Sequence, residues 1–275
     1  MSKLYSISEF VKFYFTAKTQ YAVHSPFVYE MIEKVLDTSK HYYFDDHMQF
    51  LLAKLAKNPR AITTTDLGAG SRVHASKTKS ISQISKSAVS SQWQLKCLFN
   101  LAQTYKPRRI LELGTSLGIS ALHFANGYKE SKVISLEGDP QIAALAQENF
   151  NEFEAKNIQL VVGNFDDTLS QVLSSVDEID MVFLDGNHRK APTLQYLDLI
   201  LPNLSSEAIV IVDDIYWSPE MNSAWKTIIE HYAFDLSIDL FHFGILFRNK
   251  DILHKQNIKL INSRLKPMHR SIFFP

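Results

Sequence analysis

The chain has 275 residues, of which 45% are hydrophobic, and its 29 Lys and Arg residues balance 29 Asp and Glu residues. This composition predicts a packed core, and the zero formal charge gives no general attraction to nucleic acid or to an anionic membrane. No apolar run approaches the roughly 18 residues of a membrane span, and residues 1–6 lack the pattern of a signal peptide. The single cysteine, Cys97, cannot form an internal disulfide, so we expect a cytoplasmic protein.

Residues 1–84 are predicted to form a helical extension with a lid, because apolar side chains recur at helical spacing in residues 10–14 and 48–55. Pro26 predicts a break between helices. No Asp or Glu occurs from Leu67 through Leu111, but this stretch contains Arg72, Lys77, Lys79, Lys86, Lys96, Lys106, Arg108 and Arg109. It fits either a solvated loop followed by a helix or a positively charged lid over an active site. Tyr21, His24 and Trp93 would line that lid, unless they belong to a helical core.

Residues 109–248 alternate between short apolar runs and helical patterns, which predicts a parallel sheet built from βαβ units. The expected strands are Arg109–Leu113, Lys132–Leu136, Ile158–Val162, Ile179–Leu184 and Ala208–Val212, and the expected helices are 117–127, 140–155, 167–175, 190–202 and 219–232. Two last strands, near 235–240 and 242–248, are antiparallel because their connection is short. We therefore predict a Rossmann-like α/β fold with a seven-stranded, mostly parallel sheet, an antiparallel last strand and helices on both faces. The basic tail, 249–275, is expected at the surface.

The loop after the first of these strands reads Glu112-Leu113-Gly114-Thr115-Ser116-Leu117-Gly118 and opens a helix. Glycine allows sharp turns and close approach of a ligand, and the helix N-terminus offers free N–H groups. The G-x-x-x-G spacing differs from the G-x-G-x-x-G pattern of dinucleotide-binding loops. Glu112 would repel a pyrophosphate but can pair with an ammonium group.

This loop resembles motif I of the class I S-adenosylmethionine (SAM)-dependent methyltransferases, and most of all the version in the catechol O-methyltransferase-like branch of small-molecule O-methyltransferases. The resemblance covers about residues 85–248, which we take as the methyltransferase domain. It implies that Glu112, Gly114, Thr115, Ser116 and Gly118 surround the methionine part of SAM. The alternative is an unrelated glycine-rich turn between a strand and a helix.

A second segment, Asp66-Leu67-Gly68-Ala69-Gly70, also looks like motif I. A nucleotide-binding unit would require a further strand with an acidic end within about 25 residues, and no such strand is predicted. We interpret this segment as a turn that supports the lid.

Glu137 ends the second predicted strand, where a carboxylate can accept both hydroxyls of a ribose, and the resemblance implies the same role. Asp139 and Pro140 suit a helix start, with Asp139 as the N-cap. After the third strand, the resemblance implies that Asn164 and Phe165 bracket the adenine. The alternative makes Asp166 the helix cap and places the Phe165 ring in the core.

Acidic residues end the fourth and fifth predicted strands at Asp185 and at Asp213-Asp214. Carboxylates that gather at one edge raise one another's pKa unless a cation neutralises them, and their oxygens suit Mg²⁺. The resemblance implies a divalent metal at these three residues and a SAM contact at Asp185, although the family has Asp-Asn where this chain has Asp-Asp. His188 stands where the family has a lysine base, and it can accept a proton near neutral pH. A surface histidine, with Lys190 as the base, is the alternative.

The sequence therefore predicts a SAM-dependent methyltransferase that acts on a hydroxyl of a small molecule. Asp185 and His188 are its catalytic candidates, Mg²⁺ assistance stays open, and no nucleic-acid or membrane partner is expected. The branch often forms dimers, so a homodimer is an open expectation. Two other classes remain: an NAD(P)-dependent oxidoreductase, against which the loop spacing and Glu112 argue, and a non-catalytic SAM-binding protein, against which the intact acidic residues argue.

Overall fold

The computed structural model describes residues 3–65 and 76–266, so the motif-like segment Asp66–Gly70 lies outside the described residues. The chain divides into two compact units. One is Lys34–Ile179, and the other combines Met1–Glu33 with Asp180–Pro275. A π-helix, Ile32–Leu36, spans the boundary in sequence. No helix among the described residues is long and apolar enough to cross a membrane.

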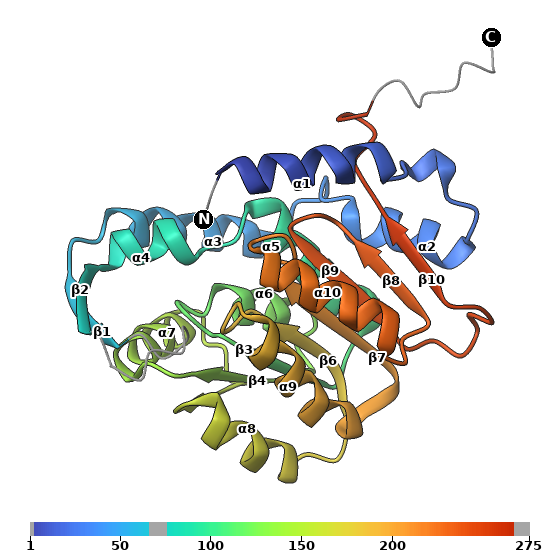
Figure 1. The fold of residues 1–275 in the computed structure, drawn as a ribbon. Helices are drawn as coiled ribbons and strands as arrows, with labels where there is room; N and C mark the ends of the chain where they lie inside the picture. Colours follow the sequence, from blue (N-terminus) through green and yellow to red (C-terminus); the bar gives the residue numbers. More distant parts are fainter. Residues whose placement is uncertain (1–2, 66–75, 267–275) are drawn as a thin grey trace. The chain divides into compact units, whose positions relative to one another are not determined.

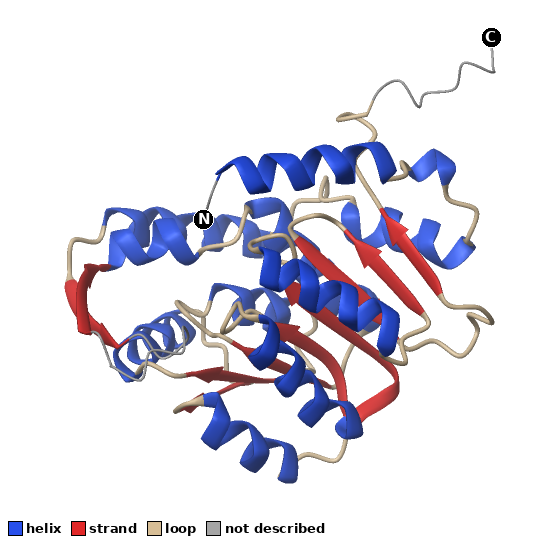
Figure 2. Cartoon of the chain, in the orientation of Figure 1, coloured by secondary structure: helices blue, strands red, loops and turns tan. Residues whose placement is uncertain are grey.

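Eight strands form the main sheet, in the order β10-β8-β9-β7-β6-β3-β4-β5, and helices flank both of its faces (Figure 2). The pairs β3–β4, β4–β5 and β8–β10 are parallel. Strand β9 is antiparallel to both β7 and β8. The Rossmann-like α/β fold is therefore confirmed, with an antiparallel seventh strand. The prediction of seven strands is wrong by one, because β10 extends the sheet beyond β8.

The Lys34–Ile179 unit alternates strands and helices after an initial helical layer (Figure 1). Its elements are α3 (Tyr43–Lys57), β1 (Ala61–Thr65), β2 (Ser76–Ser80), α4 (Ile81–Ala88), α5 (Gln92–Tyr105), β3 (Arg109–Leu113), α6 (Ile119–Gly127), β4 (Lys132–Glu137), α7 (Pro140–Glu152), β5 (Ile158–Val162), α8 (Phe165–Ser174) and the first residue of β6 (Ile179–Leu184). Strands β1 and β2 form a separate antiparallel pair. The described part of the stretch from Leu67 to Leu111 is therefore not a solvated loop followed by one helix, because it includes β2, α4 and α5. The interpretation as a lid stays a prediction.

The other unit joins the two ends of the chain. Its elements are α1 (Lys3–Thr16), a 3₁₀ turn (Gln20–Ala22), α2 (Pro26–Met31), the rest of β6, α9 (Lys190–Ile200), a 3₁₀ turn (Leu201–Asn203), β7 (Leu204–Asp213), α10 (Pro219–His231), β8 (Leu236–Asp239), β9 (Phe243–Phe247) and β10 (Gln256–Lys259). Helix α1 packs through Phe13, whose ring centroid lies 5.4 Å from that of Phe241 and 6.2 Å from that of Tyr216. These rings hold the N-terminal helix against residues more than 200 positions later.

Several strands of the main sheet are continuously buried, whereas β5, at one end of the strand order, contains only half-buried and exposed residues. Every residue of β9 is buried, and so are Met181–Leu184 of β6 and residues 110–113 of β3. Such continuous burial is typical of the central strands of α/β sheets. Loops at the carboxyl ends of these strands then carry the polar side chains.

Candidate functional site

The loop between β3 and α6 depends on glycine at two positions. Gly114 and Gly118 have φ angles of +104° and +77°, which are costly for residues with a side chain, and Ser116 adopts +49°. A Cβ on Gly118 would lie 2.3 Å from Cε1 of Phe150 on α7. The N–H groups of Gly114 and Thr115 donate to the Leu136 carbonyl at 3.0 and 3.1 Å. The loop is therefore fixed to the end of β4 by its backbone.

Glu112 lies beneath this loop and is fully buried. Its Oε2 accepts a short hydrogen bond from the Ser135 hydroxyl, which is 2.5 Å from Oγ1 of Thr115. Its Oε1 has no hydrogen-bond partner among the described residues. Burial raises the pKa of Glu112 to about 7, while Ser120 and Ser135 act in the opposite direction. Sequence reasoning missed Ser135, although a serine inside a buried strand is a signal that its hydroxyl has a partner.

Glu137 ends β4 and joins two segments of the site. Its Oε2 accepts the Ser116 N–H at 2.8 Å, and its Oε1 accepts the Asp139 N–H at 2.9 Å. Burial raises the pKa of Glu137, and these backbone donors lower it. Asp139 accepts the N–H groups of Gln141 and Ile142. The prediction that Asp139 caps the next helix is confirmed.

The segment after β5 begins at Gly163, whose N–H donates to the Glu137 carbonyl at 2.9 Å. Asn164 is the N-cap of α8, and its Oδ1 accepts the Asp166 N–H at 3.2 Å. The alternative with Asp166 as the cap is therefore wrong. Phe165 is half-buried rather than part of the core. Because β3, β4 and β5 are parallel neighbours, Gly114–Gly118, Glu137 and Asn164 lie at one edge of the sheet.

In the other unit, His188 lies between two carboxylates. Its Nε2 is 3.8 Å from Oδ1 of Asp185, and its Nδ1 is 3.8 Å from Oδ2 of Asp214. Asp185 follows β6, and Asp214 follows β7 with a φ of +54°. His242 joins this group through its charge interaction with Asp214, a contact that sequence reasoning missed. Only the tertiary fold brings His242 to this point, so no local pattern could have indicated it.

The charge state of His188 follows from its surroundings. Burial lowers the pKa of His188, and the Asp214 carboxylate opposes that shift. Burial raises the pKa of Asp214, while His188 and His242 lower it. Lys190 donates to Oγ of Ser223 at 2.8 Å, so its ammonium already has a partner. His188 is thus the better placed of the two candidate bases.

The three predicted metal ligands are not arranged together as a metal site would require. Asp213 is buried at the end of β7, opposite Phe243 in the strand register. Among residues 3–65 and 76–266, no group of three or more His, Cys, Asp or Glu side chains is arranged to hold a metal ion. Asp185, Asp213 and Asp214 therefore do not fit the predicted Mg²⁺ site, and no chemical step is derived through a metal.

The three aromatic and imidazole side chains predicted for the lid differ in exposure. Tyr21 and His24 are exposed, so the alternative that they belong to a helical core is wrong. Trp93 is half-buried, and its Nε1 donates to the Leu36 carbonyl at 3.4 Å.

Comparison with known proteins gives a consistent result. Residues 111–215 match a family model described as a methyltransferase domain. The chain is 32% identical over 142 residues to a catechol O-methyltransferase of Niastella koreensis, covering 50% of this chain and 63% of the relative. It is 31% identical over 135 residues to a catechol O-methyltransferase of Mycobacterium tuberculosis, covering 48% and 59%. The chain thus spans less than two-thirds of the length of either relative.

Solved structures agree on the fold. An O-methyltransferase from Bacillus cereus, determined in complex with SAH, is 18% identical and superposes with a TM-score of 0.54, covering 80% of this chain and 95% of that one. At this identity the likeness shows the fold alone.

Proposed function

We propose that this chain, whose residues 111–215 match a family model described as a methyltransferase domain, binds SAM and methylates a hydroxyl group of a small molecule. The proposal rests on the sequence likeness to catechol O-methyltransferases over about half of the chain. It rests equally on the polar groups at the carboxyl edge of β3, β4 and β5.

The observation that carries the proposal is the position of the Glu137 carboxylate. It lies at the end of β4, and each oxygen accepts one backbone N–H, from Ser116 or from Asp139. A carboxylate oxygen can accept more than one hydrogen bond, so both oxygens can still accept from vicinal hydroxyls. Such a carboxylate after the second strand of a nucleotide-binding unit suits a ribose.

The remaining cofactor contacts follow from the same edge of the sheet. Glu112 supplies a buried oxygen without a partner, which suits the ammonium group of the methionine part. The loop 114–118 would surround that part, and Asn164 and Phe165 would contact the adenine. When bound, SAM supplies a methyl group on a positively charged sulfur, which needs alignment more than covalent help.

We assign proton removal from the acceptor hydroxyl to His188. Its lowered pKa keeps the imidazole neutral at pH 7 and able to accept a proton. Asp185 and Asp214, each 3.8 Å from a ring nitrogen, would stabilise the imidazolium that forms. We place this activity in the cytoplasm, since the only cysteine, Cys97, is a buried free thiol. We also propose a homodimer, on the basis of the resemblance to the catechol O-methyltransferase-like branch.

Calorimetric titration with SAM tests the cofactor assignment. We expect saturable binding that Glu137→Gln weakens by roughly 10-fold or more, because the amide accepts on one atom only. Glu130→Gln is the matched control, since Glu130 is exposed and contacts only Tyr128. NAD(H) binding without SAM binding would identify an oxidoreductase instead. SAM binding without methyl transfer to any acceptor would leave a non-catalytic binding protein.

A pH profile tests the base. We expect kcat/KM for a small phenol to fall only on the acidic side of the ordinary histidine range, because burial lowers the pKa of His188 and the base is lost when its imidazole is protonated. His188→Gln should lower kcat/KM by ~100-fold or more. SAM affinity of the variant should stay unchanged. A profile that keeps its acidic limb in His188→Gln would reject this base. Activity that requires Mg²⁺ and is lost with EDTA would restore the metal-assisted mechanism.

A further inference from the structure

A cavity of about 380 Å³ lies within the Lys34–Ile179 unit. Its walls come from the 38–41 connection, helix α3, the first turns of α5 and one residue of α6. None of the residues assigned above to SAM lines it. This volume is typical of a small-molecule site, so we asked what chemistry its walls would recognise.

One wall is formed by the imidazole of His123 on α6, which is 5% exposed. Its Nδ1 lies 2.7 Å from the Ile119 carbonyl oxygen. Because a carbonyl can only accept, Nδ1 carries the proton. Burial lowers the pKa of His123 to about 4, so the ring is neutral at pH 7. Nε2 is then an acceptor, and it has no hydrogen-bond partner among the described residues.

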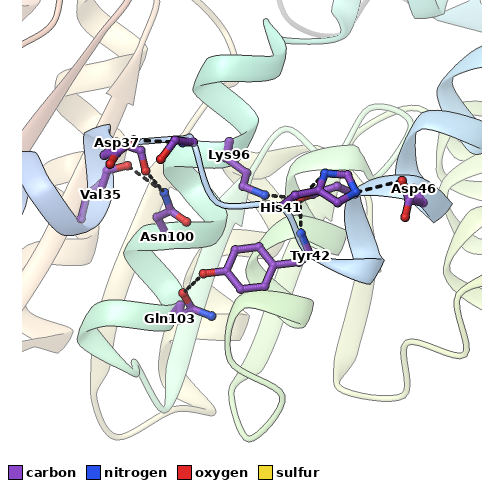
Figure 3. A network of polar contacts seen from close by, with 10 residues as sticks. Val35, Asp37, His41, Tyr42, Asp46, Lys96, Asn100 and Gln103 are labelled. Carbon is purple, nitrogen blue, oxygen red and sulfur yellow. Dashed lines mark hydrogen bonds and ion pairs between the residues drawn. The ribbon is translucent and has the colours of Figure 1, made fainter.

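A second wall carries charges that satisfy each other (Figure 3). The Lys96 ammonium forms a short ion pair with Asp45, whose Oδ2 also accepts the Tyr42 N–H at 2.7 Å. The same ammonium lies 4.5 Å from the centroid of the Tyr42 ring and 5.5 Å from that of Phe99. Lys96 is therefore committed to the protein and is poorly placed to bind an anion.

The net charge of the lining residues also disfavours a cation. His41, which also lines the cavity, holds its Nε2 3.0 Å from Oδ1 of Asp46 and its Nδ1 3.6 Å from Oδ2 of Asp45. Lys40 and Lys96 outnumber the single acid, Asp45, among the lining residues. A bound cation would face a net positive wall, whereas water screens the attraction of the exposed Lys40 for an anion, so a neutral ligand is favoured.

Of the other eight lining residues, four are apolar or aromatic and four are polar, namely Thr38, Ser39, Gln49 and Gln92. Met48 and Leu52 come from α3, and Trp93 and Leu95 come from α5. Met48 and Leu95 are buried against the protein. Methionine sulfur and an indole ring both make favourable contacts with aromatic rings. A flat apolar body can therefore pack against Leu52 and Trp93, beside the Nε2 acceptor of His123.

We propose that this cavity binds a small neutral aromatic compound that carries one N–H or O–H donor, and that this group donates to Nε2 of His123. The ring of the ligand packs against Met48, Leu52 and Trp93. The site does not depend on SAM or on the proposed methyl transfer. This is a second ligand site, and its acceptor, His123, lies on α6, the helix that follows the proposed cofactor loop.

Indole and 1-methylindole test the donor directly, because they have nearly the same shape and only indole has an N–H group. We expect calorimetry on the full chain to give at least a roughly 10-fold preference for indole, as one hydrogen bond supplies. In His123→Phe, which keeps an aromatic ring and removes the acceptor, the two affinities should become equal. His47→Phe, at an exposed position that does not line the cavity, is the control, and it should keep the preference.

A measurement on the unmodified protein guards against a variant that fails to fold. With ¹⁵N-labelled histidine, indole should shift the Nε2 resonance of His123 toward the hydrogen-bonded range and leave Nδ1 unchanged. Equal affinities of the wild type for the two compounds would overturn the proposal. A preference that persists in folded His123→Phe, or millimolar indole with no effect on the His123 resonances, would overturn it as well.

Discussion

Glu112 gives the protein a pH dependence that can be measured without any ligand. Burial raises its pKa from 4.5 to about 7, so the fold favours the protonated form. The stability that this group contributes is therefore fully present below pH 4.5 and is lost as pH rises through 7. The loss is on the order of 3 kcal/mol, from 1.36 kcal/mol per pH unit.

Replacement of Glu112 by Gln should remove this slope, because the amide is neutral at every pH. We expect the free energy of unfolding of the wild type to fall between pH 5 and pH 8 relative to that of Glu112→Gln, as measured by urea titration at several pH values. Glu154→Gln, at an exposed position, should follow the wild type. Parallel wild-type and Glu112→Gln curves would show that Glu112 is ionised throughout this range.

The residues that sequence reasoning identified and those that it missed differ in one respect. Gly118, Glu137 and Asp139 stand where a strand ends or a helix begins, and the sequence pattern predicts such positions well. Ser135 and His242 act through partners that only the tertiary fold supplies. The spacing of residues along the chain does not indicate such contacts.

Helix α6 begins where Gly118 meets α7. A methyl group there would occupy the space of the Phe150 ring, at 2.3 Å from Cε1, and would force alanine into a φ of +77°. We expect Gly118→Ala to lower the free energy of unfolding by ~2–5 kcal/mol, combining the conformational and steric costs. Urea unfolding measures this change.

Phe150→Leu separates those two costs, since a smaller side chain makes room for the methyl group but leaves the backbone strain. In the double variant the loss should be smaller than the sum of the two single losses. Additive losses would mean that the clash is relieved elsewhere, and that the conformational cost accounts for the whole effect of Gly118→Ala.

At the level of elements, all of the strands predicted between residues 109 and 248 are present, because each is an apolar run bounded by turn residues. Three strands were missed. Strand β1 reads Ala-Ile-Thr-Thr-Thr, whose β-branched residues favour a strand, and the other two have different compositions. Strand β2 reads Ser-Lys-Thr-Lys-Ser and β10 reads Gln-Asn-Ile-Lys, so neither shows an apolar run. Both are edge strands, β2 in the two-stranded sheet and β10 in the main sheet. Polar residues are tolerated and even favoured at the edges of sheets.

For the molecule as a whole, the proposed SAM contacts belong to one of the two units. Glu112, the 114–118 loop, Glu137 and Asn164 all belong to Lys34–Ile179. We expect SAM to slow hydrogen exchange most in peptides that cover residues 112–122 and 135–142, as measured by mass spectrometry. Indole, which the second site would bind, is the comparison ligand and should act instead on peptides around residues 41–52. Protection by SAM restricted to residues 180–275 would contradict the assignment.

Residues 1–33 make contacts with residues that are synthesised much later. The Lys18 N–H donates to the Lys259 carbonyl, the Ile261 N–H donates to the Lys18 carbonyl, and the Lys266 ammonium donates to the carbonyls of Tyr14 and Ala17. At the ~5–20 residues per second of protein synthesis, α1 leaves the ribosome roughly 10–50 s before these partners exist. During that interval the apolar side chains of α1 lack the residues that pack against them in the folded protein, such as Tyr216 and Phe241. A nascent chain stalled near residue 200 should therefore recruit chaperones through its first helix.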